Sequence, residues 1–316
     1  MASDIDVEFL YIIYYSLFTT TEIAFIVGLI TNVYIIAVYV MDWRKGRTMS
    51  TSDQVIISIM ISRMILQCVI QMNQFWETFC TICFAILIIR IIYFSTMYSS
   101  FWLSTLLGVV FYLKIANIHS VFISWLRKIL SKRILYFIMA SLLVSIGQTS
   151  AIYLVAFTGA KTYYVYQNST NYSYKHLPVE TMSIVFFVNI FGPFLVFFLS
   201  SLFLITSLYL HIRHMRCNRN VTSSLDPYYR IIKYIAGSLI SSIVCVIINV
   251  LAEKYYYIFG FVSYSFPWTV SGTFHSMLLI YVTPKLKNPL SRILKSLSNC
   301  WMKREEPGDL VMTVTT

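Results

Sequence analysis

Long apolar runs alternate with short polar stretches along the whole chain, and these runs predict its elements. A hydrocarbon core about 30 Å thick needs roughly 20 residues of helix, and seven runs meet that length. They lie near residues 16–40, 52–75, 86–113, 132–156, 182–210, 230–252 and 261–283. The pattern predicts an all-α membrane protein whose seven-transmembrane helix bundle spans 16–283, between an N-terminus of residues 1–15 and a tail of residues 284–316.

The positions of Lys and Arg predict how the bundle is oriented. Nineteen of the 24 basic residues fall in loops 41–51, 114–133 and 211–233 or in the tail. Because short cytoplasmic loops carry the excess of Lys and Arg, we expect an extracellular N-terminus and a cytoplasmic C-terminus in a multi-pass plasma membrane protein. Two N-glycosylation acceptors, Asn168 and Asn171, fall in loop 157–181, on the predicted outer side.

Composition narrows the class of protein. The chain is 58% hydrophobic and 12% charged, whereas a soluble domain carries about 25% charged residues. Topology accounts for the net charge of +11, so nucleic acid binding has no support. The only close pairs of metal-ligand type are Cys80-x-x-Cys83 and His211-x-x-His214, and each stands alone. We therefore predict no metal, no cofactor and no catalytic site.

The tail carries a helical pattern of its own. Its basic residues lie off an apolar stripe at helical spacing, which is formed by Leu286, Leu290, Ile293, Leu294 and Leu297. Such a pattern predicts a short amphipathic eighth helix on the anionic inner leaflet, with membrane lipid as its partner. Cys300 follows directly, and palmitoylation and a free thiol are equally good readings of it.

Five motifs, in order along the chain, carry a resemblance to a known family. Trp102 precedes an apolar run that ends in Leu-Lys-Ile-Ala-Asn at 113–117. The others are Gly28-x-x-x-Asn32 with Asp42-Trp43-x-x-x-Arg47, Ile61-Ser62-Arg63-x-x-Leu66-Gln67, Pro193-Phe194 with Ser207-Leu208-Tyr209-x-His211-x-x-x-Met215, and His275-Ser276-x-x-Leu279-Ile280 with Lys285-Leu286-Lys287. Over nearly the whole bundle the chain resembles the type 2 taste receptors, the bitter taste receptors among the G protein-coupled receptors.

Some positions depart from the family, and two other functions compete with this interpretation. Thr283 and Pro284 stand where the family usually has Asn and Ser, and helix six reads Ile232 and Ile-Ala-Gly at 235–237. The alternatives are a type 1 vomeronasal pheromone receptor and, less favoured, a polytopic transporter. The 113–117 stretch and the Lys-Leu-Lys ending favour taste, and no motif repeats between the halves as a transporter would show.

The resemblance implies a receptor for small bitter compounds, with an outer helical pocket lined by aromatic and a few polar side chains. The implied ligand-binding residues are Asn73, Trp76, Tyr93, Phe94, Met97, Tyr98, Phe186, Asn189, Asn249, Ser265 and Trp268. A serine at 265, where the family often carries an acid or another polar group, favours neutral ligands.

Arg63 lies near the middle of the second predicted span. An arginine there costs about 2.5–3.5 kcal/mol on insertion scales and needs a partner or water. The resemblance implies an inner polar network of Asn32, Arg63 and Ser276 that holds the resting bundle and rearranges on activation. The alternative is an arginine satisfied by backbone carbonyls, without a switching role.

The inner ends of helices three, five and six are basic, which suits an acidic face on a heterotrimeric G protein, gustducin-like by resemblance. The implied G protein-facing residues are Lys114, Asn117, His119, Arg127, Lys128, His211, Arg213 and Arg216. The alternative is that the charges among them only set the topology.

Overall fold

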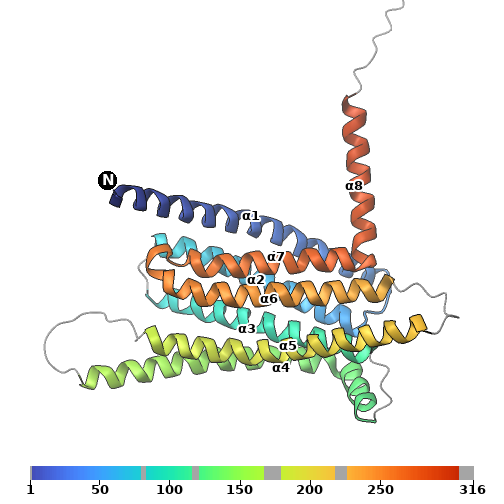
Figure 1. Cartoon of the computed structure of the whole chain (residues 1–316), viewed down its shortest axis with the longest axis horizontal. Helices are drawn as coiled ribbons and strands as arrows, with labels where there is room; N and C mark the ends of the chain where they lie inside the picture. The colour runs from blue at the N-terminus through green and yellow to red at the C-terminus, as the bar shows by residue number, and fades with distance from the viewer. Residues whose placement is uncertain (1, 80–82, 116–120, 167–178, 218–225, 306–316) are drawn as a thin grey trace, which may run out of the picture.

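The computed structural model describes residues 2–79, 83–115, 121–166, 179–217 and 226–305, and these ranges form eight helices. In Figure 1, α1 to α7 run along the long axis of the molecule, and α8 leaves the bundle at a steep angle. The predicted all-α fold is confirmed. The helices are α1 (Ala2–Arg44), α2 (Thr51–Phe79), α3 (Cys83–Ile115), α4 (Val121–Tyr166), α5 (Val179–Cys217), α6 (Asp226–Phe259), α7 (Val262–Val282) and α8 (Pro284–Glu305).

Six of the described helices contain a segment that is long and apolar enough to cross a membrane. These segments are Glu8–Arg44, Thr51–Phe75, Ile88–Leu113, Ser124–Leu154, Phe191–Leu210 and Tyr228–Ala252. Their outward faces carry large apolar side chains; on α4, for example, Leu135, Tyr136 and Leu143 are exposed. Exposed apolar surface of this extent suits contact with lipid, and the chain is a multi-pass membrane protein.

The seventh helix is different because its polar residues face the protein. At about 1.5 Å per residue, the 21 residues of α7 reach across a bilayer, but serine, threonine and histidine side chains lower its hydropathy. Ser271 is half-buried, and six others are buried: Ser263, Ser265, Thr269, Thr273, His275 and Ser276. α7 packs between α1 and α6 (Figure 1), where neighbouring helices supply hydrogen-bond partners that lipid lacks.

Local sequence signals set the turn between α1 and α2. Gly46 adopts a left-handed conformation with φ 77°, and its N–H donates to the Trp43 carbonyl at 2.9 Å. The Arg47 N–H donates to the Asp42 carbonyl at 3.2 Å, which completes a Schellman C-cap. α2 then starts with a capping box, in which Ser50 and Asp53 each accept the other's backbone N–H at 3.2 Å.

α4 begins eleven residues before the predicted span at 132. Arg133 has non-helical angles (φ −127°, ψ 28°) and divides the helix at a kink. The part before the kink turns away from the bundle axis in Figure 1. Leu126 and Leu130, one turn apart, pack against the core and hold this segment in place. The basic loop predicted over 114–133 is therefore partly helical.

The core consists of two apolar clusters. The basic-end cluster takes its name from the end of the bundle that carries the α1–α2 turn and the start of α8, and it includes Tyr39, Leu113 and Leu286. The aromatic cluster lies toward the opposite end and includes Tyr93, Tyr98, Phe101 and Trp268. Between the two clusters, α2, α3, α6 and α7 turn polar side chains toward one another.

Candidate functional site

Hydrogen bonds join α1, α2 and α7 in the middle of the bundle. Ser276 donates to Asn32 Oδ1 at 2.7 Å, and Asn32 Nδ2 donates to Gln67 Oε1 at 3.2 Å. Gln67 Nε2 donates to Thr273 Oγ1 at 3.4 Å, and that hydroxyl donates to the Ala24 carbonyl at 2.8 Å. The structure thus brings Asn32 and Ser276 into direct contact. We call Asn32, Gln67, Thr273 and Ser276 the α1–α2–α7 network.

Gly28 allows the three helices to come this close. A Cβ at that position would lie 2.2 Å from Gln67 Nε2 and 2.4 Å from Thr273 Oγ1. Both distances are shorter than any ordinary contact, so a larger residue would push these side chains out of their hydrogen bonds. The Gly28-x-x-x-Asn32 motif therefore places a position without a side chain and a polar side chain one turn apart on the same face of α1.

Arg63 lies beside this network but does not bond directly to Asn32 or Ser276. Its side chain is buried, with 9% of its surface exposed. Its Nη1 donates to the Gly272 carbonyl of α7 at 3.3 Å, and Ser276 donates to the same carbonyl at 3.1 Å. The guanidinium thus reaches the network through a shared backbone acceptor. A backbone carbonyl is the partner that the alternative interpretation of Arg63 names, and the switching role stays a prediction.

A cavity of about 50 Å³ separates the basic-end cluster from the aromatic cluster. Phe101 and Trp268, whose ring centroids are 5.1 Å apart, line it from the aromatic side. Its polar lining comprises Arg63, His275 and the serines Ser100, Ser104, Ser238, Ser241, Ser242 and Ser271. On the α6 side, Tyr234 and His275 Nε2 form a hydrogen bond of 2.9 Å. The bundle therefore has a polar layer at mid-depth.

The aromatic cluster contains five of the eleven residues that the sequence predicts for ligand binding: Tyr93, Phe94, Met97, Tyr98 and Trp268. Tyr93 packs edge-on against Phe94 and Phe261, with centroids 5.1 and 5.5 Å away, and Phe94 stacks on Tyr98 at 6.3 Å. Met97 and Tyr98 are fully buried. In this conformation the rings pack on one another, and the cavity lies one turn deeper, at Phe101.

Four of the predicted ligand-binding residues carry a buried polar atom that has no hydrogen-bond partner among the described residues. These atoms are Asn73 Nδ2, Tyr98 Oη, Asn249 Oδ1 and Trp268 Nε1. Buried polar groups in native proteins are satisfied by protein atoms or by ordered water, so these four atoms are available to a polar partner. They are two donors, one hydroxyl and one acceptor.

Among the other predicted ligand-binding residues, the structure describes the side chain of Ser265 but not those of the remaining three. Ser265 is fully buried and already satisfied, since Gln74 Nε2 donates to its hydroxyl at 3.0 Å and it donates to the Val262 carbonyl at 3.1 Å. Trp76 lies on α2, and Phe186 and Asn189 lie on α5, at positions whose side chains fall outside the described part.

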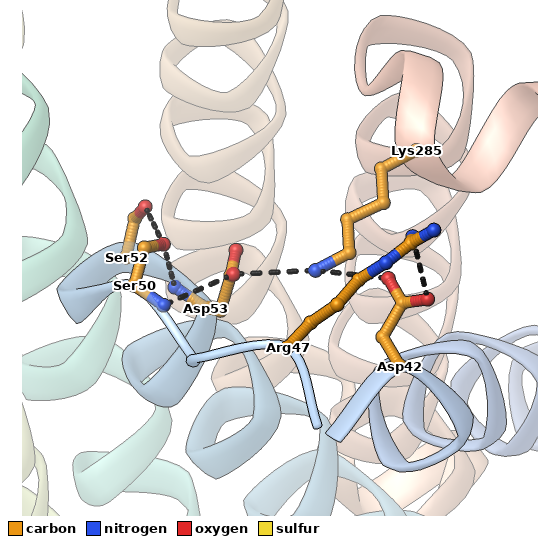
Figure 2. Close-up of polar contacts among 6 residues, drawn as sticks. All are labelled: Asp42, Arg47, Ser50, Ser52, Asp53 and Lys285. Carbon is orange, nitrogen blue, oxygen red and sulfur yellow. Dashed lines mark hydrogen bonds and ion pairs between the residues drawn. The ribbon is translucent and has the colours of Figure 1, made fainter. Parts of the chain in front are cut away.

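At the basic end, Lys285 links the first turn of α8 to both helices of the α1–α2 hairpin. Figure 2 shows its ammonium between two carboxylates, Asp42 Oδ2 at 3.2 Å and Asp53 Oδ2 at 3.3 Å. The ammonium also lies 4.5 Å from the centroid of the Tyr39 ring. Arg47 donates to Asp42 Oδ1 at 3.1 Å from the solvent side. We call Lys285, Asp42 and Asp53 the α8 clasp.

The predicted G protein-facing residues lie around this end as far as the structure describes them. Arg127 and Lys128 are exposed on α4, and Arg213 is exposed on α5. Lys114, His211 and Arg216 are on helices, but their side chains are outside the described part; Asn117 and His119 fall outside the described residues altogether, as do the acceptors Asn168 and Asn171.

Sequence reasoning missed several of these contacts. Gln67 lies in the motif 61–67, which does not predict its partners, and Lys285 lies in the Lys-Leu-Lys ending, which does not predict an ion pair. Trp102 donates through Nε1 to Gln148 Oε1 at 3.0 Å and joins α3 to α4. Gln71 donates to Glu22 at 3.0 Å across α2 and α1. One signal was available: a serine-, threonine- and histidine-rich span at 261–283 is too polar to face lipid on all sides.

The comparisons with known proteins agree with this architecture. The sequence profile of the Taste receptor protein (TAS2R) family matches residues 8–298. Taste receptor type 2 member 13 of Homo sapiens is 28% identical over 309 residues, which cover 92% of this chain and 98% of that protein. Member 9 of Homo sapiens is 26% identical over 304 residues, 89% of this chain and 93% of that protein. This chain belongs to the TAS2R family, and it is a G protein-coupled chemosensory receptor of the bitter taste class.

Proposed function

We propose that this receptor binds a small, largely apolar and neutral bitter compound at the aromatic cluster, between α2, α3, α6 and α7. The observation that carries the proposal is the set of unsatisfied atoms on Asn73, Tyr98, Asn249 and Trp268. A ligand with a donor and an acceptor would satisfy them while its apolar body packs on the rings. No acid is among these four residues, which favours a neutral ligand.

Ligand binding is coupled to the opposite end through the polar layer. Phe101 and Trp268 belong to the aromatic cluster and also line the cavity that Arg63 and His275 enter. A ligand that moves these rings changes the space beside α2 and α7, where the α1–α2–α7 network holds three helices together. A ligand shifts the bundle only by its difference in affinity between two states, and the shared side chains supply such a difference.

The basic end is the cytoplasmic end in this proposal, and it contacts a heterotrimeric G protein of the gustducin type. Support comes from the distribution of Lys and Arg and from the exposed Arg127, Lys128 and Arg213. α8 lies on the inner leaflet, because Ile293 and Leu294 are exposed apolar residues beside basic ones. The outer loop that contains Asn168 and Asn171 is then glycosylated, and the receptor lies in the plasma membrane.

The test of the ligand site uses the four unsatisfied atoms. A panel of bitter compounds is screened by calcium release in cells that carry a promiscuous G protein, and an active compound is then titrated on Asn73→Leu, Tyr98→Phe, Asn249→Leu and Trp268→Phe. One hydrogen bond contributes about 0.5–1.5 kcal/mol net, so we expect the half-maximal concentration to rise about 2- to 12-fold in at least one variant, at unchanged surface level.

Tyr136→Phe is the matched control for Tyr98→Phe, because Tyr136 is 74% exposed on the outer face of α4. It should leave the titration curve unchanged. If all four site variants respond like the parent receptor, the aromatic cluster is not the ligand site. The orientation has a separate test: an epitope tag on the tail should stay hidden from antibody until the cells are permeabilised.

A further inference from the structure

Among the described residues, the cavity between the two clusters has an unbalanced lining, with a positive charge and hydrogen-bond donors but no carboxylate. Arg63 and His275 line it together with the serines of α3, α6 and α7, and no described Asp or Glu does. The described acids of the neighbouring helices are engaged elsewhere. Glu22 accepts a hydrogen bond from Gln71, and Asp42 and Asp53 bind Lys285.

The guanidinium of Arg63 has more donors than acceptors available to it. Among the described residues its one hydrogen bond is the contact of Nη1 with the Gly272 carbonyl at 3.3 Å. The side chain is 91% buried, since 9% of it is exposed. A buried charge without a counter-charge is strongly unfavourable unless water or an ion compensates it. The remaining N–H groups therefore need acceptors inside the cavity.

The other polar groups of the lining also offer protons. When Tyr234 donates to His275 Nε2, the imidazole carries its proton on Nδ1, and Nδ1 has no partner in the described part of the chain. The hydroxyls of Ser241 and Ser271 lie 2.9 Å apart and add two more groups that can donate to the lining. A cavity that offers donors around a cation is suited to an acceptor with negative charge.

We propose that this cavity binds a small monovalent inorganic anion, with chloride as the physiological candidate. A volume of about 50 Å³ has room for about three or four water molecules. A halide with one or two waters fits, whereas an organic carboxylate with a carbon chain does not. The anion neutralises Arg63 and accepts hydrogen bonds from His275 and from the pair formed by Ser241 and Ser271.

Bound there, the anion ties α2, α6 and α7 together at mid-depth. It therefore stabilises the arrangement of helices described above by mass action, in proportion to its concentration over its dissociation constant. This role does not depend on which compound occupies the aromatic cluster. It adds to the bitter receptor an ion site that sets the resting stability of the bundle.

The experiment measures thermal unfolding of the purified receptor in detergent, in sodium chloride or sodium gluconate at equal ionic strength. Gluconate is too large for the cavity. The two salts therefore screen charges equally, but only chloride can bind inside. We expect a saturable rise of the melting temperature with chloride and not with gluconate. Bromide should reproduce it. Equal melting temperatures in both salts at every concentration would show a cavity that holds water only and would overturn the proposal.

Two variants locate the site. Arg63→Gln removes the charge, and Ser238→Val fills the cavity from α6 without touching Arg63; each should weaken the apparent chloride affinity at least tenfold. Ser145→Ala is the control, because Ser145 is equally buried on α4 but does not line the cavity. If Arg63→Gln does not fold, Ser238→Val decides alone. A chloride effect that survives intact in Ser238→Val places the ion elsewhere and refutes the assignment.

Discussion

Replacing Gly28 by alanine is the sharpest test of how α1, α2 and α7 pack. The new Cβ would lie 2.2 Å from Gln67 Nε2 and 2.4 Å from Thr273 Oγ1. The Gln67 side chain can rotate away, but it then loses its bonds to Asn32 and Thr273. Thr273 is β-branched and stiff, and turning its hydroxyl breaks the 2.8 Å bond to the Ala24 carbonyl.

The magnitude follows from these losses. If Gln67 rotates away, its two hydrogen bonds are lost at about 0.5–1.5 kcal/mol each, and overpacking a filled core costs about 1–3 kcal/mol. The expected destabilisation of Gly28→Ala is therefore about 2–6 kcal/mol. At about 2–4 °C per kcal/mol for chains of 150–250 residues, the melting temperature in detergent should fall by about 4 °C or more, read from tryptophan fluorescence.

Gly147→Ala is the matched control, because Gly147 lies within α4 and a Cβ at that position would have no atom within 4 Å. Alanine favours a helix over glycine by up to about 1 kcal/mol, so this variant should melt at the same temperature or higher. The two substitutions thus have opposite expected signs. In a background of Gln67→Ala and Thr273→Ala, the cost of Gly28→Ala should shrink, because the obstructing atoms are gone. Equal melting of the Gly28 and Gly147 variants would refute the packing argument.

Three further predictions concern single contacts, and thermal unfolding checks each of them. Lys285→Met leaves two carboxylates without their shared cation and should cost about 1–3 kcal/mol, whereas Lys287→Met, which removes no ion pair among the described residues, should cost little. Gln148→Leu leaves the Trp102 N–H unsatisfied at about 1–3 kcal/mol, and a second change, Trp102→Phe, should restore most of that loss. Ser276→Ala removes the donor of the 2.7 Å bond to Asn32 on α1, so the free energy of unfolding should fall by about 1–3 kcal/mol. Ligand-independent calcium release should also rise at matched surface level. An unchanged basal signal would rule out a switching role for this network.

The apolar runs predicted the helices because the bilayer imposes one length on every span and leaves the backbone no other way to satisfy its hydrogen bonds. Short motifs in order also predicted the family. The helix of α4 before Arg133 escaped prediction, because its apolar residues are interleaved with charges that mark loops elsewhere. The polarity of α7 signalled a helix inside the bundle, but not which helices would receive its side chains.

The amino-acid order alone thus determined the number of helices, their polar and apolar faces and the basic end. Beyond the pairing of Asn32 and Ser276 that the resemblance implied, tertiary structure decided which polar residues meet: Thr273 reaches the Ala24 carbonyl across 249 positions, and Lys285 reaches Asp53 across 232. Hydrophobic periodicity describes the face of one helix, whereas such contacts depend on the rotation and depth of two or three helices at once. For that reason Gln67, the serine-lined cavity and the α8 clasp became visible only in the folded bundle.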